Sequence, residues 1–136
     1  MRRDAVDGLP VVGSENSSQL GARHGIDIQV DAAGNVVLDG GGMSVTPGWR
    51  SLDYKRIPRR LRDLCPGASG NNSNACFTMG NGPFQRCSVA SGLELIPDHG
   101  QAMAHHGVVA PSGSVPFRQY QAALESTRGQ WRVDEQ

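Results

Sequence analysis

Residues 116–131, PFRQYQAALESTRGQW, contain the clearest helical pattern in this chain. Phe117, Tyr120 and Leu124 recur at intervals of three and four residues, which places their side chains on one face of a helix. Pro116 suits the first helical position, because the N–H that proline lacks would be unpaired there. We therefore predict one helix in the last part of the sequence.

The sequence before this helix consists of short apolar pieces separated by turn-forming residues. Ile26–Val30 alternates apolar and polar residues, and Val36–Leu38 follows after a turn, so the two predict a hairpin. Other pieces have the length and bounds of short strands: Met43–Val45, Cys76–Met79, Leu93–Pro97 and Val108–Pro111. Six or seven short strands with one helix predict an α+β domain with small antiparallel sheets.

The length of 136 residues suits one hydrophobic core, and 18 glycines with 8 prolines argue against a helical bundle. Residues 1–18 are rich in turn-forming residues and predict a flexible leader, so that a single domain covers 19–136. No apolar run approaches the roughly 18 residues of a membrane-spanning helix, so we expect no membrane partner. The first residues lack the apolar stretch of a secretory signal.

The formal net charge is zero, which gives no overall attraction to nucleic acid or anionic membranes. Six of the thirteen basic residues nevertheless lie between Arg50 and Arg62, where Pro58 limits any helix to short turns. This stretch permits a contact with nucleic acid that would weaken as salt rises. The three cysteines lack the spacing of a zinc site.

The segment Gly40–Ser44 and the histidines are the first candidates for chemistry. Glycines let a backbone approach a ligand, and the Ser44 hydroxyl could bind a ribose or a phosphate, but a tight connection into a strand explains the same glycines. His106 comes directly before a strand and could bind a sugar hydroxyl or act as an acid or base. His99 and His105 fit solvated loop residues.

Glu94 lies within an apolar strand pattern. Alternation with Leu93 and Leu95 directs its side chain away from the core, so solvent exposure is the default prediction. A cleft on that side of the strand would make this carboxylate a catalytic candidate instead.

Three stretches, taken together, resemble the small bacterial toxin family named after the second type-six-exported toxin, of the ADP-ribosyltransferase-like class. They are 20–28, then 41–47, then 106–111 continuing through 116–131. The resemblance implies two small antiparallel sheets, split around an NAD-binding cleft, with one C-terminal helix. It also implies a toxin held in the cytoplasm of the producer, delivered to the cytoplasm of a target cell, and neutralised by a cognate immunity protein.

The resemblance assigns roles to residues of this sequence. Ser44 is the strand hydroxyl that lines the cleft, with Gly42 and Met43 beside it. His106 is the histidine before the late strand, and Arg23 is the arginine that positions the dinucleotide.

Release of nicotinamide from NAD builds positive charge on the ribose, which a carboxylate normally stabilises. The chain contains no Gln-x-Glu or Glu-x-Glu pair, so Glu94 is the candidate carboxylate. The leading hypothesis is a monomeric enzyme that transfers ADP-ribose from NAD to a protein or nucleic acid. An NAD glycohydrolase on the same fold and a non-enzymatic binding module are the alternatives.

Overall fold

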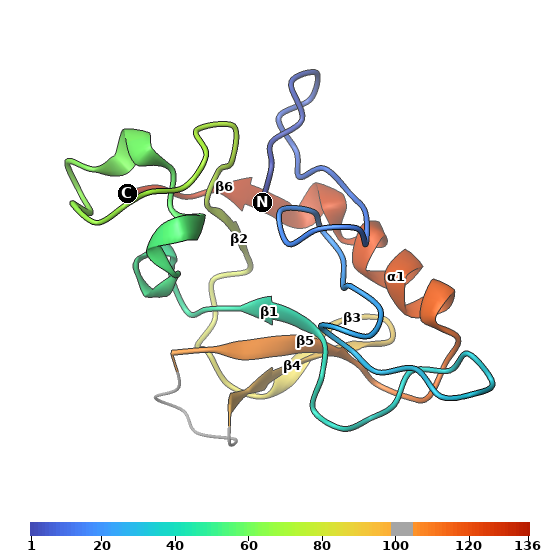
Figure 1. Ribbon diagram of the computed structural model, residues 1–136. Helices are drawn as coiled ribbons and strands as arrows, with labels where there is room; N and C mark the ends of the chain where they lie inside the picture. The colour runs from blue at the N-terminus through green and yellow to red at the C-terminus, as the bar shows by residue number, and fades with distance from the viewer. Residues whose placement is uncertain (99–104) are drawn as a thin grey trace.

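The computed structural model describes residues 1–98 and 105–136, and within them it contains two antiparallel sheets and one α-helix (Figure 1). The larger sheet has the strand order β1-β5-β4-β3. Its strands are β1 (Met43–Val45), β5 (Gly107–Pro111), β4 (Leu93–Pro97) and β3 (Cys87–Ala90). The smaller sheet pairs β2 (Phe77–Met79) with β6 (Trp131–Val133), and helix α1 spans Phe117–Ser126. The predicted α+β class, with two small antiparallel sheets and a C-terminal helix, is confirmed.

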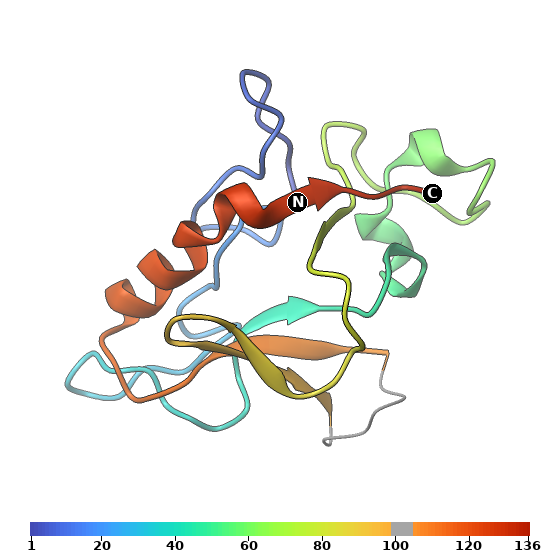
Figure 2. The same cartoon turned by 180° about the vertical axis from the view of Figure 1, so that it is seen from behind.

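The larger sheet has one face in the core. Met43 pairs with Val109 across β1 and β5, and both side chains are buried in the same cluster as Leu93 of β4. In Figures 1 and 2 this sheet forms the base of the molecule, with α1 and the smaller sheet above it. The face with Met43 and Val109 therefore points toward α1, and the neighbouring residues of each strand point away from it.

Helix α1 covers the core with the face that the sequence predicted. Tyr120 and Leu124 are almost fully buried, as expected from their spacing. Pro116 is the N-cap rather than the first helical residue, because its backbone is extended and the helix begins at Phe117. No helix within the described residues has the length and apolar character needed to span a membrane.

The hairpin predicted from Ile26–Val30 and Val36–Leu38 is confirmed only in its turn and its closing contacts. Val30 and Val36 form an antiparallel bridge and Val37 N donates to Gln29 O (2.9 Å), but neither segment is a regular strand. The chain instead turns tightly at Arg23, whose carbonyl oxygen accepts hydrogen bonds from Ile26 N (3.2 Å) and Asp27 N (2.9 Å). Asp27 also accepts a bond from Arg23 N, and such local side-chain to backbone bonds compete with strand pairing.

A second hydrophobic cluster underlies the basic stretch. Three short 3₁₀ turns occur there, as the proline predicted: η1 (Trp49–Ser51), η2 (Tyr54–Arg56) and η3 (Arg59–Leu61). A further 3₁₀ turn, η5 (Arg128–Gln130), follows α1. The buried members of the cluster are Trp49, Ile57, Leu61, Ala68 and Cys76.

Strands β3 and β6 were not predicted from the sequence, because they are short and mostly exposed.

Residues 1–18, predicted as a flexible leader, contact the rest of the chain at several points. Ala75 N donates to Met1 O (2.8 Å), and the Arg128 guanidinium binds both Pro10 O (2.7 Å) and the Asp7 carboxylate (2.6 Å). Pro10 is fully buried. The segment therefore lies against the domain, and its mobility stays a prediction.

Candidate functional site

Ser44 lies on the face of the larger sheet that points away from α1. It pairs with Val108 of β5, and its neighbour Met43 faces the core, so strand alternation directs the Ser44 side chain outward. Ser44 is exposed. Its hydroxyl is accessible to a ligand that binds this outer face.

His106 lies on the same outer face. The β4–β5 ladder continues one residue beyond Pro97 and Gly107, because Asp98 N donates to His106 O (2.9 Å). His106 is two residues from Val108, the partner of Ser44, and so shares its side of the sheet. Diagonal neighbours on adjacent strands lie about 7–8 Å apart, which places His106 and Ser44 within reach of one small molecule.

Asp98 completes this group, and the sequence analysis missed it. Its Oδ2 lies 2.8 Å from His106 Nδ1, and both side chains are nearly half exposed, at 46% for Asp98 and 45% for His106. The only signal in the sequence was that Asp98 follows one predicted strand directly and His106 precedes the next. Asp98 and His106 face each other only because β4 and β5 pair with Pro97 opposite Gly107.

Glu94 also faces outward, as the alternation predicted. It pairs with Ala110 of β5 on one side and Ser88 of β3 on the other. Its Oε1 accepts a hydrogen bond from Arg86 Nη2 (2.8 Å), and the side chain is 26% exposed. Four residues of β4, about 13 Å, separate Glu94 from Asp98.

Arg23 lies at the other end of β1 from His106. Its guanidinium binds the Asp27 carboxylate through Nε (3.0 Å) and Nη2 (3.1 Å), and the Asp27 carbonyl accepts from Gly42 N (2.8 Å). The hydrogen bonds with Asp27 raise the pKa of Arg23. The structure therefore groups Ser44 with His106 but not with Arg23, whose charge already has a partner.

Packing within the fold explains why Gly42 and Met43 occupy the start of β1. A Cβ on Gly42 would lie 2.7 Å from the carbonyl oxygen of Val109, so no larger residue fits there without a shift. The Met43 side chain is in the core, and its N–H donates to the Tyr120 hydroxyl (3.0 Å). These two residues shape the start of β1, and Ser44 is the one that presents a polar side chain on the outer face.

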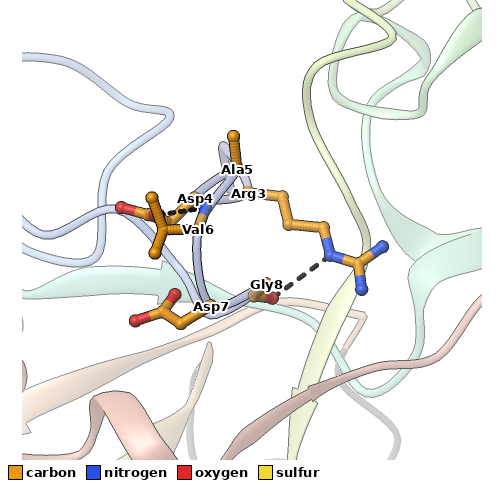
Figure 3. A pocket seen from close by; sticks show the side chains of 6 residues that line it. All are labelled: Arg3, Asp4, Ala5, Val6, Asp7 and Gly8. Atoms are coloured by element: carbon orange, nitrogen blue, oxygen red, sulfur yellow. Dashed lines mark hydrogen bonds between the residues drawn. The ribbon is translucent and has the colours of Figure 1, made fainter.

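Two hollows lie elsewhere on the molecule. One, of about 460 Å³, is the concave side of the turn Arg3–Gly8, where Arg3 Nε donates to Gly8 O (Figure 3). The other, of about 410 Å³, lies beside α1 between Ser14 and Glu125. Neither contains a predicted site residue. His99 lies outside the described residues, and no group of acidic, histidine or cysteine side chains within residues 1–98 and 105–136 could hold a metal ion.

No family model, curated protein or solved structure matches this chain. The site is therefore defined by its geometry: a hydroxyl and an imidazole on neighbouring strands, with a carboxylate bound to the imidazole.

Proposed function

We propose that this chain is an NAD-cleaving toxin domain of the ADP-ribosyltransferase-like class, which transfers ADP-ribose to a macromolecule in the cell that receives it. The observation that carries the proposal is that the stretches on which the resemblance rests meet in space. Segment 41–47 contains β1 and segment 106–111 contains β5, and the two strands pair directly. The residues that resemble the family therefore occupy one region of the fold.

Stretch 20–28 and the helical part of the third stretch, 116–131, join the same region. Tyr120 of α1 accepts a hydrogen bond from Met43 N and donates to Val109 O (2.5 Å). Gln121 of α1 binds both Leu20 O and Ala22 N, which attaches segment 20–28 to the helix. These contacts span up to 101 residues of sequence.

NAD is the substrate in this proposal, and Ser44 and His106 are the residues that contact it. A serine hydroxyl and an imidazole can each hydrogen-bond a ribose hydroxyl, and both side chains are open to solvent on the outer face. Glu94 is the candidate carboxylate for positive charge on the ribose, but it lies about 13 Å along β4 from Asp98, so it reaches that ribose only if the bound sugar extends from His106 toward Ala110. Its partner Arg86 lies beside it and is 68% exposed; the guanidinium is paired with Glu94 through Nη2, as that of Arg23 is with Asp27, and we propose that a pyrophosphate binds its other N–H groups.

The exposed side chains of Ser44 and His106 also suit the expected partners. A macromolecular acceptor needs access to the ribose, and an immunity protein that covered the face would block it. We propose that the chain is a monomer that acts in the cytoplasm of the target cell. Sedimentation of the purified chain at the 14.5 kDa mass of one copy would support this.

The test expresses the chain inside a sensitive bacterium and follows growth and nicotinamide release. The wild type should arrest growth, whereas Ser44→Ala and His106→Ala should abolish arrest and lower nicotinamide release on the order of 10²-fold. Ser51→Ala and His105→Ala are matched controls, because both residues are exposed and neither is a residue of the proposed site. The controls should act as the wild type.

A harmless wild type, or site variants as toxic as the wild type, would remove the proposal. Purified protein then separates transfer from hydrolysis. Nicotinamide release that needs cell lysate indicates ADP-ribose transfer, and equal release without lysate indicates an NAD glycohydrolase. Calorimetric binding of NAD with no release under either condition would leave a binding module.

A further inference from the structure

Asp98 and His106 form a hydrogen-bonded pair at the end of the β4–β5 hairpin, and the effect of this pair on stability is small. The Oδ2–Nδ1 distance is 2.8 Å, but both side chains are nearly half exposed. Exposed pairs contribute about 0–1 kcal/mol, because water screens the charges and the side chains lose freedom. The backbone bond from Asp98 N to His106 O already joins the two strands there.

The contact has a stronger effect on the imidazole itself. An ionised carboxylate can only accept hydrogen bonds, so Nδ1 of His106 must carry the proton that it donates to Asp98. Neutral imidazole carries one N–H, which leaves Nε2 with a free lone pair. Asp98 therefore sets both the tautomer and the orientation of the ring.

The two polar neighbours of His106 come from opposite sides of β5. Asp98 comes from β4, on one side of β5, and Ser44 comes from β1, on the other. Because Nδ1 is bound to Asp98, Nε2 is the nitrogen left free for a group that binds over Ser44 and His106.

We propose that His106 is the general base that takes the proton of the acceptor hydroxyl or water, and that Asp98 is the positioning residue that holds it in this state. This inference rests on the proposed function. The bond between the nicotinamide nitrogen and ribose C1′ breaks, and its electron pair leaves with neutral nicotinamide. The acceptor oxygen bonds to C1′, its proton passes to Nε2, and the Asp98 carboxylate faces the resulting imidazolium.

The experiment compares Asp98→Asn with the wild type in two measurements. The first is steady-state nicotinamide release, with lysate or water as the acceptor source. Asp98→Asn should lower kcat on the order of 10²-fold and leave the KM for NAD unchanged, because Asp98 does not contact NAD. Asp98→Glu should recover part of the loss, and Asp63→Asn, which removes an exposed carboxylate from the turn after η3, should match the wild type.

The second measurement is the ¹⁵N NMR spectrum of the histidine rings, with the His106 signals assigned by their loss in His106→Ala. In the neutral form of the wild-type ring the proton should lie on Nδ1, and Asp98→Asn should shift this toward the Nε2–H tautomer. His105 should be the same in both proteins. Circular dichroism checks that each variant is folded.

The outcomes separate the inference from the proposed function. Asp98→Asn with wild-type kcat, or with an unchanged His106 tautomer, overturns the inference even if NAD is cleaved. A wild type that releases no nicotinamide overturns the proposed function and, with it, the assignment of His106 as the base of this reaction. The tautomer would then still show whether Asp98 orients the ring.

Discussion

The hydroxyl of Tyr120 makes two hydrogen bonds within the core. It donates to Val109 O (2.5 Å) and accepts from Met43 N (3.0 Å), so it links α1 to β5 and β1 at one point. Burial raises the pKa of this phenol, so it stays protonated and remains a donor. The contact keeps the start of β1 beside β5.

Tyr120→Phe should lower the free energy of unfolding by about 1–3 kcal/mol, because it leaves a buried N–H and a buried C=O without their partner. Urea unfolding followed by fluorescence measures the change. Tyr54→Phe is the control, since Tyr54 is 58% exposed and should have no effect. Equal stability of Tyr120→Phe and the wild type would contradict this role.

Gly42 is the glycine whose substitution has the clearest steric consequence for the site. An alanine Cβ would meet Val109 O at 2.7 Å and the Tyr120 hydroxyl at 3.2 Å. Gly42→Ala should therefore destabilise the fold by roughly 1–3 kcal/mol, as overpacked sites do. Thermal unfolding of Gly42→Ala and Gly48→Ala makes the comparison, because nothing lies within 4 Å of a Cβ on Gly48. Equal loss in both variants would argue against this contact.

The buried thiol of Cys76 should react more slowly with alkylating reagents than the exposed thiol of Cys87. Burial raises the pKa of the Cys76 thiol to about 11, so very little thiolate forms near pH 8, and the side chain is shielded. Cys87 is exposed. Iodoacetamide at pH 8 should label Cys87 well before Cys76, as read by mass spectrometry of the peptides, and both equally in urea. Early labelling of Cys76 in the folded protein would show that its cluster opens readily.

At the scale of elements, Glu135 joins the segment after β6 to η3. Its carboxylate forms a short bidentate ion pair with Arg60 and also accepts from Cys76 N (3.2 Å). The hydrogen bond with Arg60 is the main reason that the pKa of Glu135 lies below its usual value. A carboxyl whose pKa falls on folding stabilises the protein above its unfolded-state pKa.

Glu135→Gln should therefore lower stability at pH 7 and flatten the acid side of the stability profile. In the wild type this contribution is complete above the usual glutamate pKa of about 4.3, and is lost as the pH falls through the lower folded-state value. Urea unfolding at a series of pH values from 7 to 3 measures it. Glu15→Gln, at an exposed position, should keep the wild-type profile. Parallel profiles for Glu135→Gln and the wild type would mean that the pair adds nothing.

At the scale of the whole molecule, two hydrophobic clusters differ in the secondary structure that surrounds them. One lies between the larger sheet and α1, and its central strand β5 is buried along its whole length. The other lies under the 3₁₀ turns, where short-range bonds such as Leu61 N to Pro58 O (3.0 Å) hold the backbone. Segments with few regular hydrogen bonds open at lower free energy than a central strand.

Hydrogen exchange should therefore show two levels of protection. The amides of β5 should exchange at the rate of global unfolding, and those of residues 49–65 should exchange faster through local opening. Exchange measured by NMR across a series of low urea concentrations distinguishes the two. A single common level would show that both clusters unfold together.

Local patterns were enough for much of the fold. The spacing of Phe117, Tyr120 and Leu124 predicted α1, and the apolar pieces at β1, β4 and β5 were predicted close to their observed bounds. The alternating pattern of Ile26–Val30 predicted a strand that does not form. Alternation reflects only side-chain polarity, and the Asp27 side chain bonds the Arg23 backbone in a turn instead. A local signal predicts an element well only when no nearby side chain competes for the backbone.

The site shows the same division between local and long-range information. Sequence alone determined that Ser44, Glu94 and His106 lie on or beside short strands, and that Glu94 faces away from the core. Only the tertiary structure decided that Ser44 and His106 share a face, that Arg23 is bound to Asp27, and that Asp98 meets His106. The physical reason is register, because a shift of one residue turns every side chain of a strand to the other face. Met43 and Val109 pack in one cluster with α1, whose Tyr120 is 77 residues from Met43 in the sequence.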